Sequence, residues 1–540
     1  MLSLDFICNY DSLILKDTKK INKLAFALDM AVAGRSDESV WIRQAQEIRK
    51  QMTDSLIDSA FTYLPEGVKH DEIELIKQKL KRRRLELEAV ASQYYRLLQR
   101  TPVVAGTNQS DYFLIERQAP DRTILRIYDP ETGDCRLEQQ FSGKETKELW
   151  LYGLAGNDTF EVKGNTRKDF PIYLISGEGE NQYQLNHSRK IHVYDKDYKY
   201  DYQKIKYHKI SFTPWGIYDS DKGISLGTFF TYTMYGFKRA PFTYQHRIGY
   251  NYLKGFMYAG VFPNYDGRRR LYLNASISSP RNFENFFGFG NNTAGYKEEK
   301  KNYNRVKLRT YMFNPSFEMD LRKEEVMTFF GSLDMYKAKR TDDRYIYTVY
   351  GEDHPIFRTN YFVGLGATYR ITKQPYSWLP LLETEWTAGW KMNLKKPERN
   401  FPYAQGSLSW NVRFSDRFTW ASLMKGTVLF DNDYEFYQAA TIDLRGFRDN
   451  RFIGKQSFYQ YSDLRLDMGK LKNPFTPLKY GLFAGFDYGR VWFPGERSHS
   501  WHTSYGGGIW LTFLNKFTTK YSWFGSTDSF RFAFELGLGF

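Results

Sequence analysis

The chain has 540 residues, enough for roughly two to four domains, and it is rich in aromatic residues, with 42 Tyr and 43 Phe. Its net charge is +15, but Lys and Arg are spread along the chain, which argues against a nucleic-acid partner and favours anionic lipid head groups. The mean hydropathy is −0.60 and no run of about 18 apolar residues occurs, so helical membrane spans are excluded.

Residues 1–105 are predicted to form a helical segment. From Glu72 to Leu98 apolar residues recur near the helical period, as expected for an amphipathic helix. A basic cluster at 79–84 lies within this helix. We interpret it as a solvated face, with contact to a membrane or to a partner as the alternative.

Residues 106–204 are predicted to form a small β-rich domain that contains a repeat. The segment 150–162 aligns with 173–185 at an offset of 23 residues. The alignment matches three positions, namely Gly156 with Gly179, Asp158 with Asn181, and Phe160 with Tyr183. A repeat at a fixed offset predicts two coils of a small solenoid.

The turn at 153–160 resembles the Gly-rich calcium turns of β-roll proteins, in which carboxylates and carbonyls supply oxygen ligands. Asn157 and Asp158 are the candidate ligands here. The second copy of the repeat has Asn181 where a carboxylate is expected, so a purely structural turn is the preferred alternative. No other cofactor is predicted.

Residues 205–540 are predicted to form an antiparallel β-barrel that crosses a membrane. The pattern is clearest in the last strand, where large apolar side chains occupy every second position: Phe530, Phe532, Phe534, Leu536, Leu538 and Phe540. In water such a face is an aggregation hazard, whereas in lipid it is the outer face of a closed barrel. A buried strand of a soluble sandwich is the alternative.

Sixteen strands are predicted, an even number as bacterial barrels require. They are 206–214, 223–235, 240–252, 255–263, 268–278, 304–322, 326–338, 359–372, 382–395, 401–414, 418–430, 456–468, 478–492, 502–514, 516–524 and 529–540. With the C-terminus in the periplasm, the long connections 279–303, 339–358 and 431–455 all fall outside the cell. The long connections lie on the same side only if 304–322 is one strand despite Asn314-Pro315.

The connection 431–455 contains an arginine that is predicted to fold into the barrel. Arg445, Gly446 and Phe447 lie in this loop, and the next two strands carry Asp463 and Arg465, then Asp487, on faces that alternation assigns to the lumen. A charge-assisted pair between Arg445 and these carboxylates would pin the loop inside.

This ordered set of residues resembles the BamA/TamA outer-membrane family, also called bacterial surface antigens. The resemblance covers roughly 205–540 and implies sixteen strands, with Arg445-Gly446-Phe447 in the sixth outer loop and its partners on strands twelve and thirteen. It also implies insertion of other barrels or translocation of polypeptides, by opening the seam between 206–214 and 529–540.

Residues 1–200 lack the βααββ pattern of the POTRA modules that such assembly factors carry. The segments 64–67, 94–98 and 150–158 are instead similar to the region that joins a metallophosphoesterase-type or kinase-like domain to such a barrel in long proteins of Bacteroidetes-type bacteria. The first residues do not have the pattern of a signal peptide, so we expect an upstream domain and its signal peptide to be missing.

No enzyme motif is found in the chain, and no catalysis is predicted. The leading hypothesis is a barrel in the outer membrane of a Gram-negative bacterium that acts on polypeptide clients. The alternatives are a membrane anchor for an upstream enzymatic domain, a passive pore, and a soluble all-β binding protein.

Overall fold

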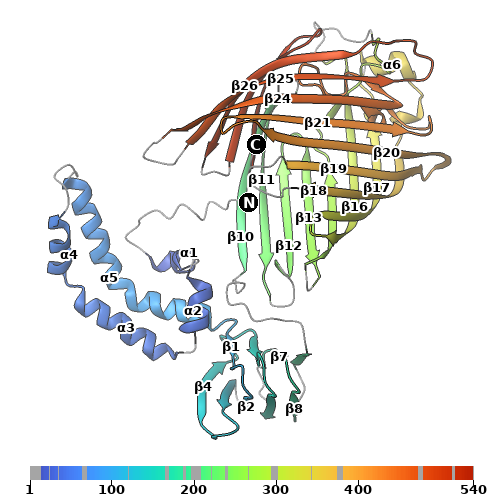
Figure 1. The fold of residues 1–540 in the computed structure, drawn as a ribbon. Coiled ribbons are helices and arrows are strands. Elements are labelled where there is room, and N and C mark those ends of the chain that lie inside the picture. Colours follow the sequence, from blue (N-terminus) through green and yellow to red (C-terminus); the bar gives the residue numbers. More distant parts are fainter. Residues whose placement is uncertain are drawn as a thin grey trace. The chain divides into compact units, whose positions relative to one another are not determined.

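A computed structural model describes residues 14–22, 25–34, 36–63, 70–118, 121–164, 169–186, 190–195, 208–219, 222–236, 241–264, 267–293, 302–341, 343–373, 381–471, 478–513 and 517–538. The chain divides into two compact units, of which the first comprises the helices and strands before residue 208 and the second is a barrel (Figure 1). Each unit is considered by itself.

The first unit opens with five α-helices. They are α1 (Thr18–Ile21), α2 (Phe26–Val32), α3 (Glu38–Gln51), α4 (Asp54–Ala60) and α5 (His70–Leu98). The end of α5 is anchored by Tyr94 and Leu98, which are buried in a cluster with Phe26 and Met30 of α2. Within the described ranges, no helix has both the length and the apolar content that a membrane crossing requires.

The basic cluster of α5 pairs with α4 and is not simply a solvated face. Lys81 lies 2.9 Å from Asp58, and Arg84 lies 2.8 Å from Asp54. Because residues three or four apart share one helix face, both pairs form along a single line of contact. The sequence pattern of α5 alone did not reveal this partner helix.

The β-rich part of the first unit contains two sheets. One is parallel, with β1 (Val103–Ala105), β5 (Leu149–Tyr152), β7 (Ile172–Gly177) and β9 (Ile191–Asp195) in that order. The other has the order β4 (Cys135–Ser142), β3 (Arg122–Tyr128), β2 (Tyr112–Gln118), β6 (Thr159–Gly164) and β8 (Gln182–Leu185). In the second sheet β2, β6 and β8 are parallel, while β2, β3 and β4 are antiparallel.

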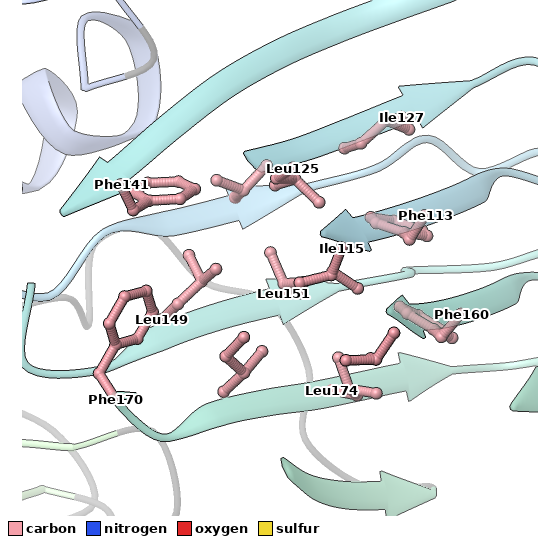
Figure 2. Close-up of a cluster of buried hydrophobic side chains, with 13 residues drawn as sticks. Phe113, Ile115, Leu125, Ile127, Phe141, Leu149, Leu151, Phe160, Phe170 and Leu174 are labelled. Atoms are coloured by element: carbon pink, nitrogen blue, oxygen red, sulfur yellow. The ribbon is translucent and has the colours of Figure 1, made fainter. Parts of the chain in front are cut away.

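The two sheets form a solenoid of three coils where the sequence predicted two. Phe113, Phe160 and Tyr183 occupy equivalent positions on β2, β6 and β8, and their rings stack with centroids 4.5 and 5.7 Å apart. These rings belong to or pack against a core that includes Leu151 and Leu174 (Figure 2). The first coil escaped detection because β3 and β4 are inserted between β2 and β5, which breaks the offset of 23 residues.

The barrel of the second unit has sixteen antiparallel strands that close on themselves, as predicted. The strands are β10 (Lys209–Asp219), β11 (Gly223–Met234), β12 (Tyr244–Asn251), β13 (Gly255–Pro263), β14 (Arg269–Ile277), β16 (Arg305–Arg322), β17 (Glu325–Ala338), β18 (Asn360–Lys373), β19 (Leu381–Asn393), β20 (Lys396–Arg413), β21 (Phe418–Leu429), β24 (Gln456–Leu471), β25 (Leu478–Trp492), β26 (His502–Phe513), β27 (Phe517–Gly525) and β28 (Phe530–Leu538). A short strand, β15 (Phe283–Asn285), extends the pairing of β16.

Strand β16 runs unbroken through Asn314-Pro315, as the placement of all long connections at one end of the barrel required. Its ladder with β14 continues across both residues, whereas its ladder with β17 passes directly from Phe313 to Ser316. Proline has no amide hydrogen to donate, so a local interruption on one side is the expected effect. The predicted strand boundaries differ from the observed ones by at most five residues. Differences of five occur at the end of the first strand, which was predicted over 206–214 and ends at Asp219, and at the start of β20, which was predicted at 401 and begins at Lys396. Residues 206–207 lie outside the described residues.

Long connections gather at one end of the barrel, and short turns lie at the other. We number the connections at the long end: loop one joins β10 to β11, loop three joins β14 to β16 and carries β15, and loop four holds α6 (Tyr345–Tyr350). Loop six spans 430–455, loop seven joins β25 to β26, and loop eight joins β27 to β28.

Candidate functional site

Loop six folds back onto the inner wall of the barrel. Its short strands β22 (Ala440–Thr441) and β23 (Ile453–Gly454) pair with each other and close the base of the loop. Between them, Leu444 and Phe447 are buried against Tyr459 of β24 and Val491 of β25. The apolar side chains of the loop therefore hold its tip against two neighbouring strands.

Arg445 at this tip joins two carboxylates on β24 and β25. Its Nη1 donates to Asp463 Oδ1 at 2.6 Å, and its Nε donates to both oxygens of Asp487 at 3.1 Å. Its Nη2 also pairs with Asp487, and its backbone amide donates to Asp487 Oδ2 at 3.1 Å. The planar guanidinium suits this site because its several N–H donors can bind two carboxylates at once.

The pair is buried and further supported by neutral groups. Asp487 is fully buried and accepts a hydrogen bond from the buried Ser504 hydroxyl at 2.7 Å. The ring of Phe524 on β27 lies 3.9 Å from the guanidinium carbon. Buried charges are tolerated only when paired and hydrogen-bonded, and each charge at this site meets that condition.

Two glycines make room for the loop tip. A Cβ atom on Gly485 would lie 2.7 Å from both Arg445 Nη2 and Asp463 Oδ1. A Cβ atom on Gly446 would lie 2.6 Å from Ser504 Cβ and 2.8 Å from the Gly525 carbonyl oxygen. A Cβ atom on Gly446 would therefore meet the backbone of β27, and one on Gly485 would displace the Arg445 guanidinium from Asp463.

Arg465 and Phe447, which were also predicted to hold loop six inside the barrel, contribute less to the ion pair than Asp463 and Asp487 do. Arg465 lies 3.6 Å from Asp463, at the edge of the ion-pair geometry. Phe447 contributes its buried ring and also its carbonyl oxygen, which accepts a hydrogen bond from Arg531 of β28. Sequence reasoning missed Arg531, Ser504 and the spatial role of Gly485. Alternation placed Arg531 on the lumen face, but nothing in the pattern linked it to loop six.

The C-terminal residues lie where the alternating pattern places them, as far as they are described. Phe530 is 70% exposed, and the rings of Phe532 and Phe534 pack against Trp523 and Tyr521 of β27 in tilted arrangements. Leu536 and Leu538 lie in β28, and Phe540 falls outside the described residues.

Two cavities lined by described residues lie beside the docked loop. One of about 440 Å³ is lined by Arg445, Asp463 and Lys520, and another of about 790 Å³ is lined by Trp215, Lys254 and Tyr336. Both reach Glu535 on the inner face of β28. Loop six therefore partitions the lumen near the last strand.

The barrel closes through a weak seam between its first and last strands. In the described residues, the ladder of β10 and β28 comprises two register pairs, Tyr218 with Phe534 and Asp219 with Ala533. The neighbouring ladder of β10 and β11 comprises eleven pairs, and that of β27 and β28 comprises nine. The remainder of β10 thus presents a strand edge beside β28.

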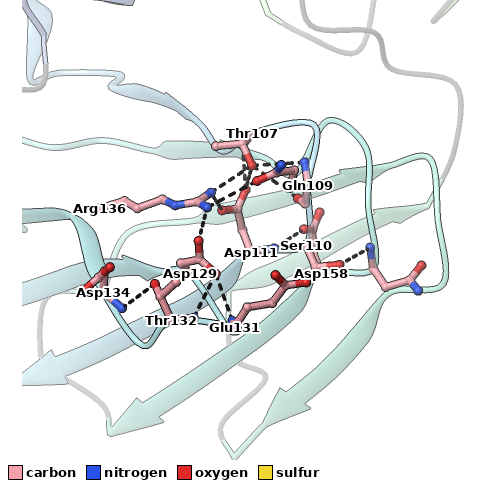
Figure 3. Close-up of polar contacts among 11 residues, drawn as sticks. Thr107, Gln109, Ser110, Asp111, Asp129, Glu131, Thr132, Asp134, Arg136 and Asp158 are labelled. Carbon is pink, nitrogen blue, oxygen red and sulfur yellow. Dashed lines mark hydrogen bonds and ion pairs between the residues drawn. The ribbon is translucent and has the colours of Figure 1, made fainter.

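The candidate calcium residues take part in hydrogen bonds between coils of the solenoid. Asp158 Oδ1 accepts from the Asp111 amide at 2.9 Å (Figure 3). Asn181 Oδ1 accepts from the Asp158 amide at 2.9 Å. Asn157 Oδ1 accepts from the Glu180 amide at 2.9 Å. Within the described ranges, no group of three or more His, Cys, Asp or Glu side chains has metal-binding geometry. Calcium binding at Asn157 and Asp158 stays a prediction.

Asp158 should make the first unit less stable as the pH rises. Burial raises the pKa of Asp158 to about 7, against the hydrogen bond from Asp111, while the nearby Asp111 charge adds to the rise. The pKa of an aspartate in the unfolded chain is about 4. Between about pH 4 and pH 7, Asp158 is therefore protonated in the folded state and ionised in the unfolded state. We expect stability to fall by up to about 4 kcal/mol from pH 4 to 7 and then to level off.

The measurement is urea unfolding of the full chain at several pH values, read by pulsed hydrogen exchange in β6. The control is Asp158→Asn, which mimics the neutral side chain and copies Asn181 of the next coil. It should remove this pH dependence. A wild-type unfolding midpoint that does not change over this range would show that Asp158 is not buried as described.

Comparisons with known proteins place few constraints on the chain. No protein-family model matches it, and no curated protein matches it. Among solved structures, it is similar to BamA from Haemophilus ducreyi lacking POTRA domains 1–3, at 11% identity and a TM-score of 0.46, over 64% of this chain and 72% of that one. It is also similar to CdiB from Escherichia coli at 10% identity and a TM-score of 0.41, over 61% of this chain and 63% of that one. CdiB from Acinetobacter baumannii gives 12% identity and a TM-score of 0.37, over 62% of this chain and 60% of that one.

Proposed function

We propose that this chain is an outer-membrane barrel of the BamA/TamA type in a Gram-negative bacterium, and that it inserts or translocates polypeptides at the seam between β10 and β28. The observation that carries the proposal is the seam itself, which has two register pairs among the described residues, where the adjoining ladders have nine and eleven.

The outer surface of the barrel supports placement in lipid. Large apolar side chains are exposed around the wall, for example Ile210 at 71%, Leu365 at 63% and Trp386 at 61%. A soluble protein rarely exposes so much contiguous apolar surface, whereas a closed barrel in a bilayer requires it. By the usual orientation the short turns face the periplasm, so the helices and the solenoid, which precede β10, are proposed to be periplasmic.

The seam supports polypeptide as the client. A strand edge that lacks a full ladder offers amide and carbonyl groups to an incoming extended chain. Among the residues that the structure describes, opening the seam costs two register pairs, whereas opening either ladder beside it costs nine or eleven. The wall should therefore part here first.

A cysteine pair that closes the seam tests this function. Tyr218→Cys with Phe534→Cys, in a background without native cysteines, places two thiols at a directly paired position. We expect the oxidised variant to fail to restore the outer-membrane protein profile of a depletion strain, and a reductant to restore it.

The matched control is Phe230→Cys with Ile248→Cys, a lipid-facing pair within the full ladder of β11 and β12. It should restore the profile when oxidised. If depletion leaves the profile unchanged, the assembly role is wrong, and the barrel acts instead as an anchor or a pore.

A further inference from the structure

Loop seven ends in an aromatic residue that packs on the outer surface of the barrel. Because Asp487 of β25 faces the lumen, alternation puts Tyr488 and Trp492 of the same strand on the outer face. The ring of Trp501, the last residue of loop seven, lies 5.7 Å from that of Tyr488 and 6.3 Å from that of Trp492. It also lies 6.2 Å from the ring of Phe458 on β24. Aromatic groups of this kind gather where a barrel wall meets the interface between membrane and water.

Arg490 lies among these rings. It alternates with Tyr488 and Trp492 on the outer face of β25, and it is directly opposite Phe458 in the ladder with β24. Its guanidinium carbon is 4.8 Å from the centre of the Trp492 ring and 5.8 Å from that of Trp501. Arg490 is only 9% exposed. We call Arg490 together with Phe458, Trp492 and Trp501 the arginine cage.

The charge of the cage is not neutralised within the described residues, which include all of loop seven and the adjoining strand ends. The one hydrogen bond of the Arg490 guanidinium there runs from Nη2 to the Ser498 carbonyl oxygen at 2.8 Å, and the buried Nε lacks an acceptor. Glu496, the one acid of loop seven, is engaged by loop three instead. Its carboxylate accepts from the amides of Asn291 and Asn292 at 2.7 and 2.9 Å. A guanidinium has five N–H donors, and an unpaired charge beside lipid is costly.

The surroundings of the cage indicate which anion fits it. Farther along the outer face of β25, Phe486 and Leu482 are 50% and 45% exposed, so an apolar strip leads away from Arg490 towards the short-turn end. Arg497 of loop seven is exposed and adds a second positive charge. A lipid with a phosphate headgroup matches both features, because guanidinium groups bind phosphate oxygens and acyl chains cover apolar strands.

We propose that the arginine cage binds the phosphate headgroup of a lipid in the outer leaflet of the membrane. Nη1 of Arg490, which has no described acceptor, donates to the phosphate, and the Trp rings hold the guanidinium in place. The acyl chains lie along β25 over Phe486 and Leu482. The inference rests on the proposed placement of the barrel in the outer membrane, and it is independent of polypeptide insertion.

Native mass spectrometry of the purified full chain tests the cage. The probes are lipid A with its phosphates and the same lipid with its phosphates removed. The wild type should bind the phosphorylated form at least about 10-fold more tightly, the effect of hydrogen bonds to a charged group. Arg490→Gln should bind the two forms alike. The control Arg340→Gln removes the same charge from an exposed site in loop four and should keep the preference.

A second variant, Trp501→Leu, keeps the charge but opens the cage, and it should also weaken binding of the phosphorylated form. It decides the test if Arg490→Gln does not fold. The proposal is overturned if the wild type binds both lipids equally, or if a folded Arg490→Gln keeps the preference. Inorganic phosphate at the concentration of the lipid should not displace it, and displacement would overturn a lipid as the occupant. Membrane fractionation checks the placement of the barrel separately, and the seam disulfide checks polypeptide insertion.

Discussion

Replacing Arg445 with alanine should lower the free energy of unfolding of the barrel by about 3–5 kcal/mol. The substitution leaves the carboxylates of Asp463 and Asp487 near each other and without their guanidinium partner. An unpaired buried charge loses hydration without compensation, which makes the removal of one partner costly. Urea unfolding of the protein from lipid vesicles measures this free energy.

The matched control is Arg340→Ala. Arg340 also lies in an outer loop and pairs with an aspartate, but its side chain is 60% exposed and that of Asp353 is fully exposed. Loss of an exposed pair should cost less than about 1 kcal/mol. Equal costs for the two variants would mean that Arg445 does not sit between buried carboxylates.

Replacing Phe160 with alanine should destabilise the solenoid by about 3–5 kcal/mol. Phe160 is fully buried and its ring lies between those of Phe113 and Tyr183, so one truncation disrupts contacts in all three coils. The truncation would leave a cavity between parallel strands, and the hydrogen-bonded ladders of these strands restrict the collapse of that cavity. Urea unfolding of the full chain, read by pulsed hydrogen exchange in β2 and β8, measures the effect.

Tyr128→Ala serves as the control because Tyr128 stacks on Tyr112 at the half-buried outer side of β3. It should cost clearly less than Phe160→Ala. If Phe160→Ala leaves protection in β8 unchanged, the coils do not share one core, and the repeat would be two independent turns.

The barrel was predictable because each strand that crosses lipid alternates apolar side chains on its outer face with other side chains on its inner face. In β28, for example, exposed Phe530 is followed by buried Arg531, as expected where one face of a strand meets lipid and the other meets the lumen. The end of the first strand was placed five residues early because Pro214 and Gly216 weaken the strand pattern, whereas the ladder of β10 with β11 continues through both. The sequence therefore indicated where each wall element lies but located the seam less well.

The number of solenoid coils and the packing of loop six against the inner wall were less predictable. Asp111 and Phe113 repeat the pattern of Asp158 and Phe160, but at an offset lengthened by the insertion of β3 and β4. The space for the guanidinium depends on Gly485, whose role appears only when the loop and the strand are brought together. Alternation assigns a face to each residue, whereas it gives no information on which loop returns to that face.

The most direct test of the central claim is a double-mutant cycle between Arg445→Ala and Asp487→Ala, measured by unfolding from lipid vesicles. If Arg445 is locked against Asp487 inside the barrel, each single variant leaves a buried partner, and the double variant should cost at least about 2 kcal/mol less than the sum of the two. Costs that add within about 0.5 kcal/mol would show that the two residues do not interact, and would contradict the docked loop.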